Sequence, residues 1–140
     1  MQFRQFGNKY IIRIDKGEEI IQTLKQFCKE HQIKLGSISG IGATDEVEIA
    51  FFAAQTKQFH KKAITTDMEI APLIGNITTM NGEVYLHLHL NLGDSEHKSY
   101  SGHLNKAIVS TTFEAIIEAI DGEVDREFSS EIGLNLLKLE

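Results

Sequence analysis

The sequence predicts an α+β protein in which a mainly antiparallel β-sheet packs against one major helix. Several short segments alternate apolar and polar residues, as strands with one buried face do. One segment, about residues 16–31, carries a one-sided apolar stripe with helical spacing instead. The strand-like segments follow one another with short connections, which favours antiparallel neighbours.

The first elements are a strand over residues 3–14 and the helix over about residues 16–31. Asp15 and Glu18 have the spacing of a capping box, with the aspartate in the capping position. The apolar residues that follow fall at i, i+1, i+4, i+7 and i+8, and these are Ile20, Ile21, Leu24, Phe27 and Cys28. Cys28 is therefore expected to be a core residue rather than a reactive thiol.

Further strands are predicted at residues 35–43, 47–52, 58–64 and 68–80. Asn81-Gly82 then indicates a hairpin, because a type I′ turn needs positive φ at both central residues. The outgoing strand separates two faces clearly: Val84, Leu86, Leu88, Leu90 and Leu92 point one way, and Tyr85, His87, His89 and Asn91 point the other.

The last third of the chain is less clear. Residues 107–120 fit both a helical stripe through Phe113 and Ile117 and an alternating strand through the same two residues. Residues 132–139 alternate again, which indicates a strand.

Composition indicates one soluble domain spanning residues 1–140. The longest stretch without a charged residue has 13 residues, whereas a transmembrane helix needs about 20, so no membrane span is expected. The N-terminal segment lacks the apolar run of a signal peptide, and a single cysteine suits the reducing cytoplasm. The net charge of -6 gives no electrostatic support to nucleic-acid binding.

The histidines carry the most informative chemical pattern. His87 and His89 leave the same face of a strand, with Cα atoms about 6.6–6.8 Å apart. His103 follows 14 residues after His89, far enough to return on a neighbouring strand. Three neutral imidazoles suit zinc best, although another divalent transition metal is compatible with them. The alternative is a polar sheet face whose histidines are satisfied by hydrogen bonds, and spacing alone leaves both interpretations open.

With these residues in view, the chain resembles the plant and prokaryote conserved (PPC) domain family over nearly its whole length. The resemblance rests on the order of several motifs. These are Tyr10-Ile-Ile-Arg-Ile14, Ser39-Gly-Ile-Gly-Ala43, Leu73-Ile-Gly-Asn-Ile77, Leu86-His-Leu-His-Leu90, Asp94 and Gly102-His-Leu104.

The resemblance implies an α+β fold, a homotrimer and a bound metal, usually zinc, at His87, His89 and His103. It also favours a strand over residues 107–120. In plants the domain is joined to AT-hook segments in nuclear proteins, where it mediates oligomerisation and contacts with transcription factors. This chain has no AT-hook, and Asp67 stands where the plant pattern has a basic residue.

Three functions fit these expectations. The first is a homotrimeric, zinc-binding interaction module, associated with transcription through protein partners, which would bury exposed apolar surface near Phe51 and Phe52. The second is a small metal-dependent enzyme or ligand sensor, in which Glu69 or Asp94 serves as a base or extra ligand. No second catalytic group is evident, which favours a non-enzymatic role. The third is direct DNA binding, through a basic groove formed on trimerisation from Lys61, Lys62, Lys98 and Lys106.

Overall fold

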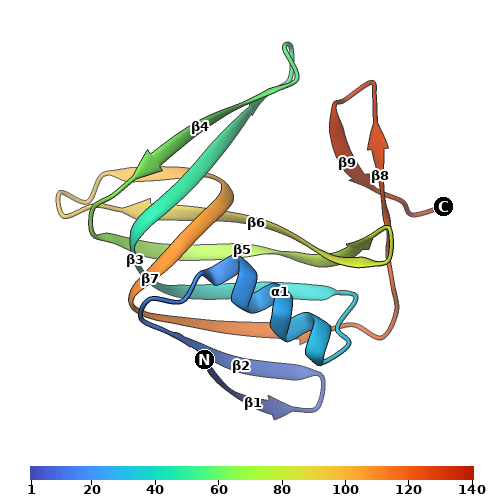
Figure 1. Cartoon of the computed structure of the whole chain (residues 1–140), viewed down its shortest axis with the longest axis horizontal. Coiled ribbons are helices and arrows are strands. Elements are labelled where there is room, and N and C mark those ends of the chain that lie inside the picture. Colours follow the sequence, from blue (N-terminus) through green and yellow to red (C-terminus); the bar gives the residue numbers. More distant parts are fainter.

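A computed structural model describes all residues, 1–140, and contains one helix and nine strands. The sequence prediction of an α+β fold with a mainly antiparallel sheet is confirmed (Figure 1). The elements are β1 (Gln2–Phe6), β2 (Lys9–Asp15), α1 (Ile20–Glu30), β3 (Gly36–Ala53), β4 (Gln58–Ile64), β5 (Met68–Met80), β6 (Glu83–Gly93), β7 (Ser99–Ala119), β8 (Arg126–Ser129) and β9 (Leu134–Leu137).

Two long strands, β3 and β7, close part of the main sheet into a ring. The sheet has the order β1-β2-β7-β6-β5-β3-β4, and β7 pairs with β3 as well. Register shifts near Gly42 and Glu48 interrupt the β3–β7 ladder, and such bulges bend a strand and increase its twist. Strands β3, β5, β6 and β7 therefore enclose apolar side chains on one face and present the other face outward.

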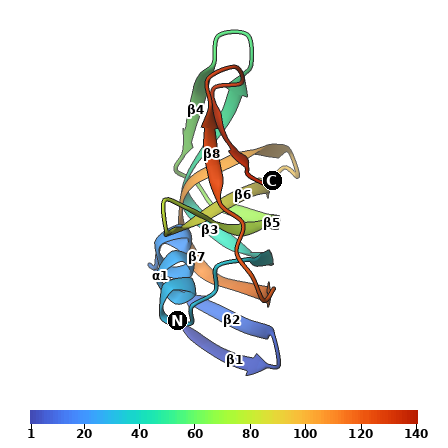
Figure 2. The ribbon, with the colours of Figure 1, turned by 90° about the vertical axis from the view of Figure 1, so that its right-hand side faces the viewer.

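The core lies inside this ring and under α1, which covers one face of the sheet (Figures 1 and 2). The buried residues of the helix are Ile20, Leu24, Phe27 and Cys28, so the predicted stripe is confirmed. Burial raises the pKa of the Cys28 thiol to about 12, so this thiol stays protonated and inert.

The helix begins four residues later than predicted. Its N-cap is Glu19, whose Oε2 accepts a hydrogen bond from the backbone N–H of Gln22 at 2.6 Å and whose Oε1 accepts one from that of Ala107 at 3.1 Å. Glu18 does accept a hydrogen bond from the backbone N–H of Asp15, but this contact lies in the turn before the helix.

The predicted strand over residues 3–14 is instead a hairpin of β1 and β2. The chain reverses at Gly7, whose φ of 59° is in the left-handed region that glycine adopts without strain. The Asn81-Gly82 turn is confirmed, with φ values of 53° and 80°. Residues 107–120 belong almost entirely to β7, as the family resemblance implied.

The C-terminal hairpin of β8 and β9 forms a second sheet that the sequence analysis predicted only in part, because it missed β8. This hairpin stands on the same side of the molecule as the β3–β4 hairpin (Figure 1). Lys57 Nζ, in the β3–β4 turn, donates a 2.8 Å hydrogen bond to the backbone carbonyl of Ser130 in the β8–β9 turn. No helix of the chain is long and apolar enough to cross a membrane.

Candidate functional site: a three-histidine cluster in an open pocket

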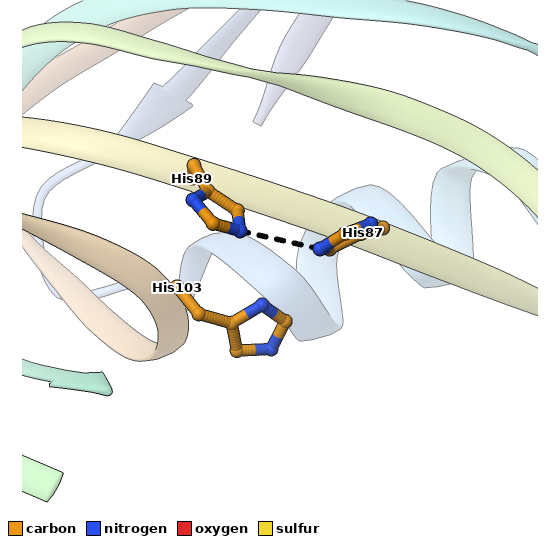
Figure 3. A group of neighbouring side chains, drawn as sticks. All are labelled: His87, His89 and His103. Carbon is orange, nitrogen blue, oxygen red and sulfur yellow. Dashed lines mark hydrogen bonds between the residues drawn. The ribbon is translucent and has the colours of Figure 1, made fainter. Parts of the chain in front are cut away.

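Three imidazoles meet on the outer face of the ring. His87 and His89 are alternate residues of β6, so both leave the face opposite to the buried Leu88 and Leu90. His103 lies on β7 directly opposite His89 in the antiparallel ladder. The ring centroids are 5.1, 5.2 and 5.4 Å apart, and Figure 3 shows the three rings turned toward a common space. Strand pairing therefore brings together the three histidines that the sequence singled out.

The nitrogen positions are suited to one metal ion. One nitrogen from each ring lies within 4.8 Å of the other two, and the Nε2 atoms of His87 and His89 are 3.2 Å apart. In tetrahedral coordination with zinc–nitrogen distances of about 2.0–2.1 Å, two ligand nitrogens are about 3.3 Å apart. The Nε2 atoms of His87 and His89 already have about this separation. Side-chain rotation of His103 would bring its nitrogen to the same distance from the other two. The donor set thus fits zinc.

Burial lowers the pKa of two of the three imidazoles, those of His87 and His103. Partial burial, followed by the proximity of the two neighbouring rings and of Arg126, lowers the pKa of His87 to about 4. Burial, followed by the proximity of His89, also lowers the pKa of His103. Because a metal binds only the deprotonated imidazole, both rings are ready to act as ligands at neutral pH.

The cluster lies on the floor of an open cavity of about 830 Å³. Phe51, Phe52 and Phe59 of the β3–β4 hairpin line one wall, and the ring of Phe59 is 5.9 Å from that of His103. The β8–β9 hairpin lines the opposite wall with Leu134, Leu136, Leu137 and Arg126. The volume is within the range of about 300–1,000 Å³ that is common for small-molecule sites.

Arg126 is the pocket residue that the sequence analysis missed. Its side chain is buried, and its nitrogens donate hydrogen bonds of 2.8–2.9 Å to Thr78 Oγ1, Asn76 Oδ1 and the backbone carbonyl of Asn135. The guanidinium also lies 4.7 Å from the centroid of the Tyr85 ring. Only the folding of β8 onto the sheet places it there, and nothing in the linear sequence signals this.

The two acidic residues suggested as additional site residues lie elsewhere. Glu69 is an exposed residue of β5, in register with Gly93, and it does not line the pocket. Asp94 accepts hydrogen bonds from the backbone N–H groups of Glu96 and Lys98 in the turn between β6 and β7. The structure therefore groups neither carboxylate with the three imidazoles.

Taken together, the fold and the site define a small antiparallel α+β protein with a three-histidine cluster on the outer face of its sheet. The sequence model of the Plants and Prokaryotes Conserved (PCC) domain matches residues 1–121, and the chain belongs to this family. The same family is called PPC in one of the solved structures described next.

Solved structures resemble the chain along nearly its whole length. A candidate DNA-binding protein from Bacteroides thetaiotaomicron is 40% identical, with a TM-score of 0.95 and coverage of 98% of this chain and 96% of that one. A metal-containing protein from Archaeoglobus fulgidus is 28% identical, with a TM-score of 0.89 and 99% coverage of both chains. A PPC protein from Pyrococcus horikoshii is 29% identical, with a TM-score of 0.87 and coverage of 98% and 94%.

One curated protein also matches part of the sequence. The bifunctional protein GlmU of Synechococcus is 24% identical over 110 residues, which is 77% of this chain. The chain spans only 16% of the length of that protein.

Proposed function

We propose that this PPC protein holds a zinc ion between His87, His89 and His103 and that the metal centre binds a small ligand in the pocket above it. The convergence of three imidazoles on the floor of an open cavity is the observation that carries the proposal. The Archaeoglobus relative, which is described as metal-containing, supports it. The single buried thiol is compatible with the cytoplasm as the site of action.

The pocket favours ligand binding over hydrolysis. Zinc held by three histidines keeps a fourth position for water or a ligand and lowers the pKa of a bound water toward 7. The residues that line the cavity include no aspartate, glutamate or lysine that would act as a base. A sensor or binding role therefore suits the lining better than an enzymatic one.

We also propose that the chain assembles as a homotrimer through the outer face of the sheet. Ile11, Ile116 and Ile74 lie in one register row across β2, β7, β3 and β5. Ser39 on β3 lies between Ile116 and Ile74, and the row continues to His89. These three isoleucine side chains are 45%, 47% and 55% exposed. Exposed isoleucines gathered in one row of a sheet are typical of an interface, and a symmetric second and third copy would cover them.

A role in transcription would act through protein contacts more readily than through direct contact with DNA. Direct contact with DNA should still be tested, because two relatives are described as candidate DNA-binding proteins. Of the four lysines proposed for a basic groove, Lys61, Lys98 and Lys106 each pair with a glutamate, and Lys62 lies over the ring of Tyr100. Direct DNA binding predicts an affinity that falls steeply with salt, and the absence of any gel shift at low salt would exclude it.

Metal analysis of untagged protein tests the central proposal. The wild-type chain should retain about one zinc per protomer after exhaustive dialysis, and a His87→Ala/His89→Ala variant should retain none. A His60→Ala variant is the matched control, because His60 is exposed on β4 and should not change the zinc content. Equal zinc in the double variant and the wild type would contradict the proposed site.

A further inference from the structure

The pocket contains a positive charge that has no acidic partner. Arg126 is 6% exposed and lines the cavity, and no aspartate or glutamate lies within ion-pair distance of it. Each of its three side-chain nitrogens donates one hydrogen bond, always to a neutral oxygen. A guanidinium has five N–H groups, so the two terminal nitrogens keep one N–H each for another acceptor.

A buried charge without a counter-ion is unfavourable, and proteins rarely keep one without a use for it. Burial lowers the pKa of Arg126, yet a guanidinium remains protonated in proteins. The neighbouring side chains fix the group in place: Asn76 accepts a hydrogen bond from it, and Tyr85 lies against its face. The side chain is therefore oriented in advance, and the partner that it lacks is an anion.

The rest of the lining restricts the chemical class of that anion. Arg126 is the only lysine or arginine that lines the cavity, so the protein offers one fixed positive charge there. A phosphate dianion is usually held by several cations or by a helix N-terminus, and neither is present at this pocket. Phenylalanine and leucine side chains on the two walls suit an organic body. A monoanionic carboxylate attached to an apolar group matches both features.

We infer that the cavity binds a small organic carboxylate whose carboxylate group sits on Arg126 and whose body lies between the two hairpins, facing the histidine cluster. The inference rests on the proposed function in that it names the ligand class of the same pocket. It also assigns a role to the β8–β9 hairpin, which lies beyond the residues 1–121 that the family's sequence model matches. This hairpin supplies both the anion-binding group and one apolar wall.

Binding of benzoate, compared with that of its uncharged analogue benzamide, tests the inference. Chemical-shift titrations of the full chain would be recorded in metal-free and in zinc-loaded protein. Benzoate should bind at least tenfold more tightly than benzamide, with the largest shifts at Arg126 and Tyr85. Arg126→Gln should abolish this preference, whereas Arg4→Gln, the same change at an exposed arginine on β1, should leave it unchanged. Arg126→Lys keeps the positive charge, so this variant should retain part of the preference for benzoate.

The zinc content of the same samples separates the two proposals. A benzoate preference that depends on Arg126 in protein that binds no zinc would support the carboxylate site and contradict the metal site. Equal binding of benzoate and benzamide, or no binding of either to wild-type protein, would overturn the carboxylate proposal even if zinc is present. The proposal would also be overturned if the wild type binds no benzoate and Arg126→Gln lowers the molar mass of the oligomer. The anionic partner of Arg126 would then be a carboxylate side chain of a neighbouring subunit.

Discussion

Gly75 provides a sharp test of how the sheet positions the histidine cluster. It lies on β5 in register with Leu88 on β6, and Leu88 is the residue between His87 and His89. A Cβ atom at this position would lie 2.0 Å from the backbone oxygen of His87 and 2.7 Å from Leu88 Cδ2. Because ordinary van der Waals contact begins at 3.4 Å, Gly75→Ala would force β6 away by more than 1 Å.

This displacement is large compared with the tolerance of a metal site, in which ligand distances hold to about ±0.2 Å. Overpacking of this kind costs about 1–3 kcal/mol in the free energy of unfolding. We expect Gly75→Ala to weaken zinc binding by about 10–100-fold, the range seen when the groups that orient metal ligands are disturbed. The assay is competition for zinc with a chromophoric chelator, together with denaturant unfolding of the metal-free protein.

Gly93→Ala is the matched control, because it lies at the end of β6 and its added Cβ would meet no atom within 4 Å. It should bind zinc with wild-type affinity. Wild-type zinc affinity and stability in Gly75→Ala would refute the argument that close packing of β5 against β6 sets the position of the histidines.

Three further predictions follow from the same structure. In metal-free protein, an NMR titration of His87 should have its midpoint near pH 4. Because folding lowers the pKa of His87, its contribution to the free energy of unfolding is fully present above about pH 6.5 and is lost as the pH falls toward 4. Unfolding measurements across this pH range would show the loss. Ile74→Glu should convert the proposed trimer to monomer in light scattering, whereas Ile120→Glu, at a similarly exposed isoleucine outside the row, should leave the proposed trimer intact; a trimer in both would exclude this interface. Glu19→Ala should lower the free energy of unfolding by about 1–3 kcal/mol, because the helix loses its N-cap and a strand N–H loses its acceptor, and Glu30→Ala should change it little.

The strands whose two faces differ most in polarity were predicted well from the sequence. On β6 the leucines alternate with Tyr85, His87 and His89, so the period of two fixed both the strand and the common direction of the histidines. The Asn81-Gly82 turn was predictable because few residue pairs adopt positive φ at two successive positions. The partnership with His103 needed only one further assumption, that the chain returns antiparallel after the turn.

The features that the sequence analysis missed depend on tertiary contacts. The helix starts at Ile20 because Glu19 caps both the helix and the strand N–H of Ala107, and no local pattern shows the second contact. The strand β8 is short, and Arg126 stands among acidic residues that suggest a solvated segment. Its burial against Asn76, Thr78 and Tyr85 exists only once β5 and β6 are paired.

The most direct test of the metal centre is a crystal structure of zinc-loaded protein, with anomalous diffraction recorded on both sides of the zinc absorption edge. We expect one strong anomalous peak per protomer, about 2.0–2.1 Å from a nitrogen of each of His87, His89 and His103. A peak at another position, or none at the histidine cluster in protein shown to contain zinc, would contradict the proposed metal site.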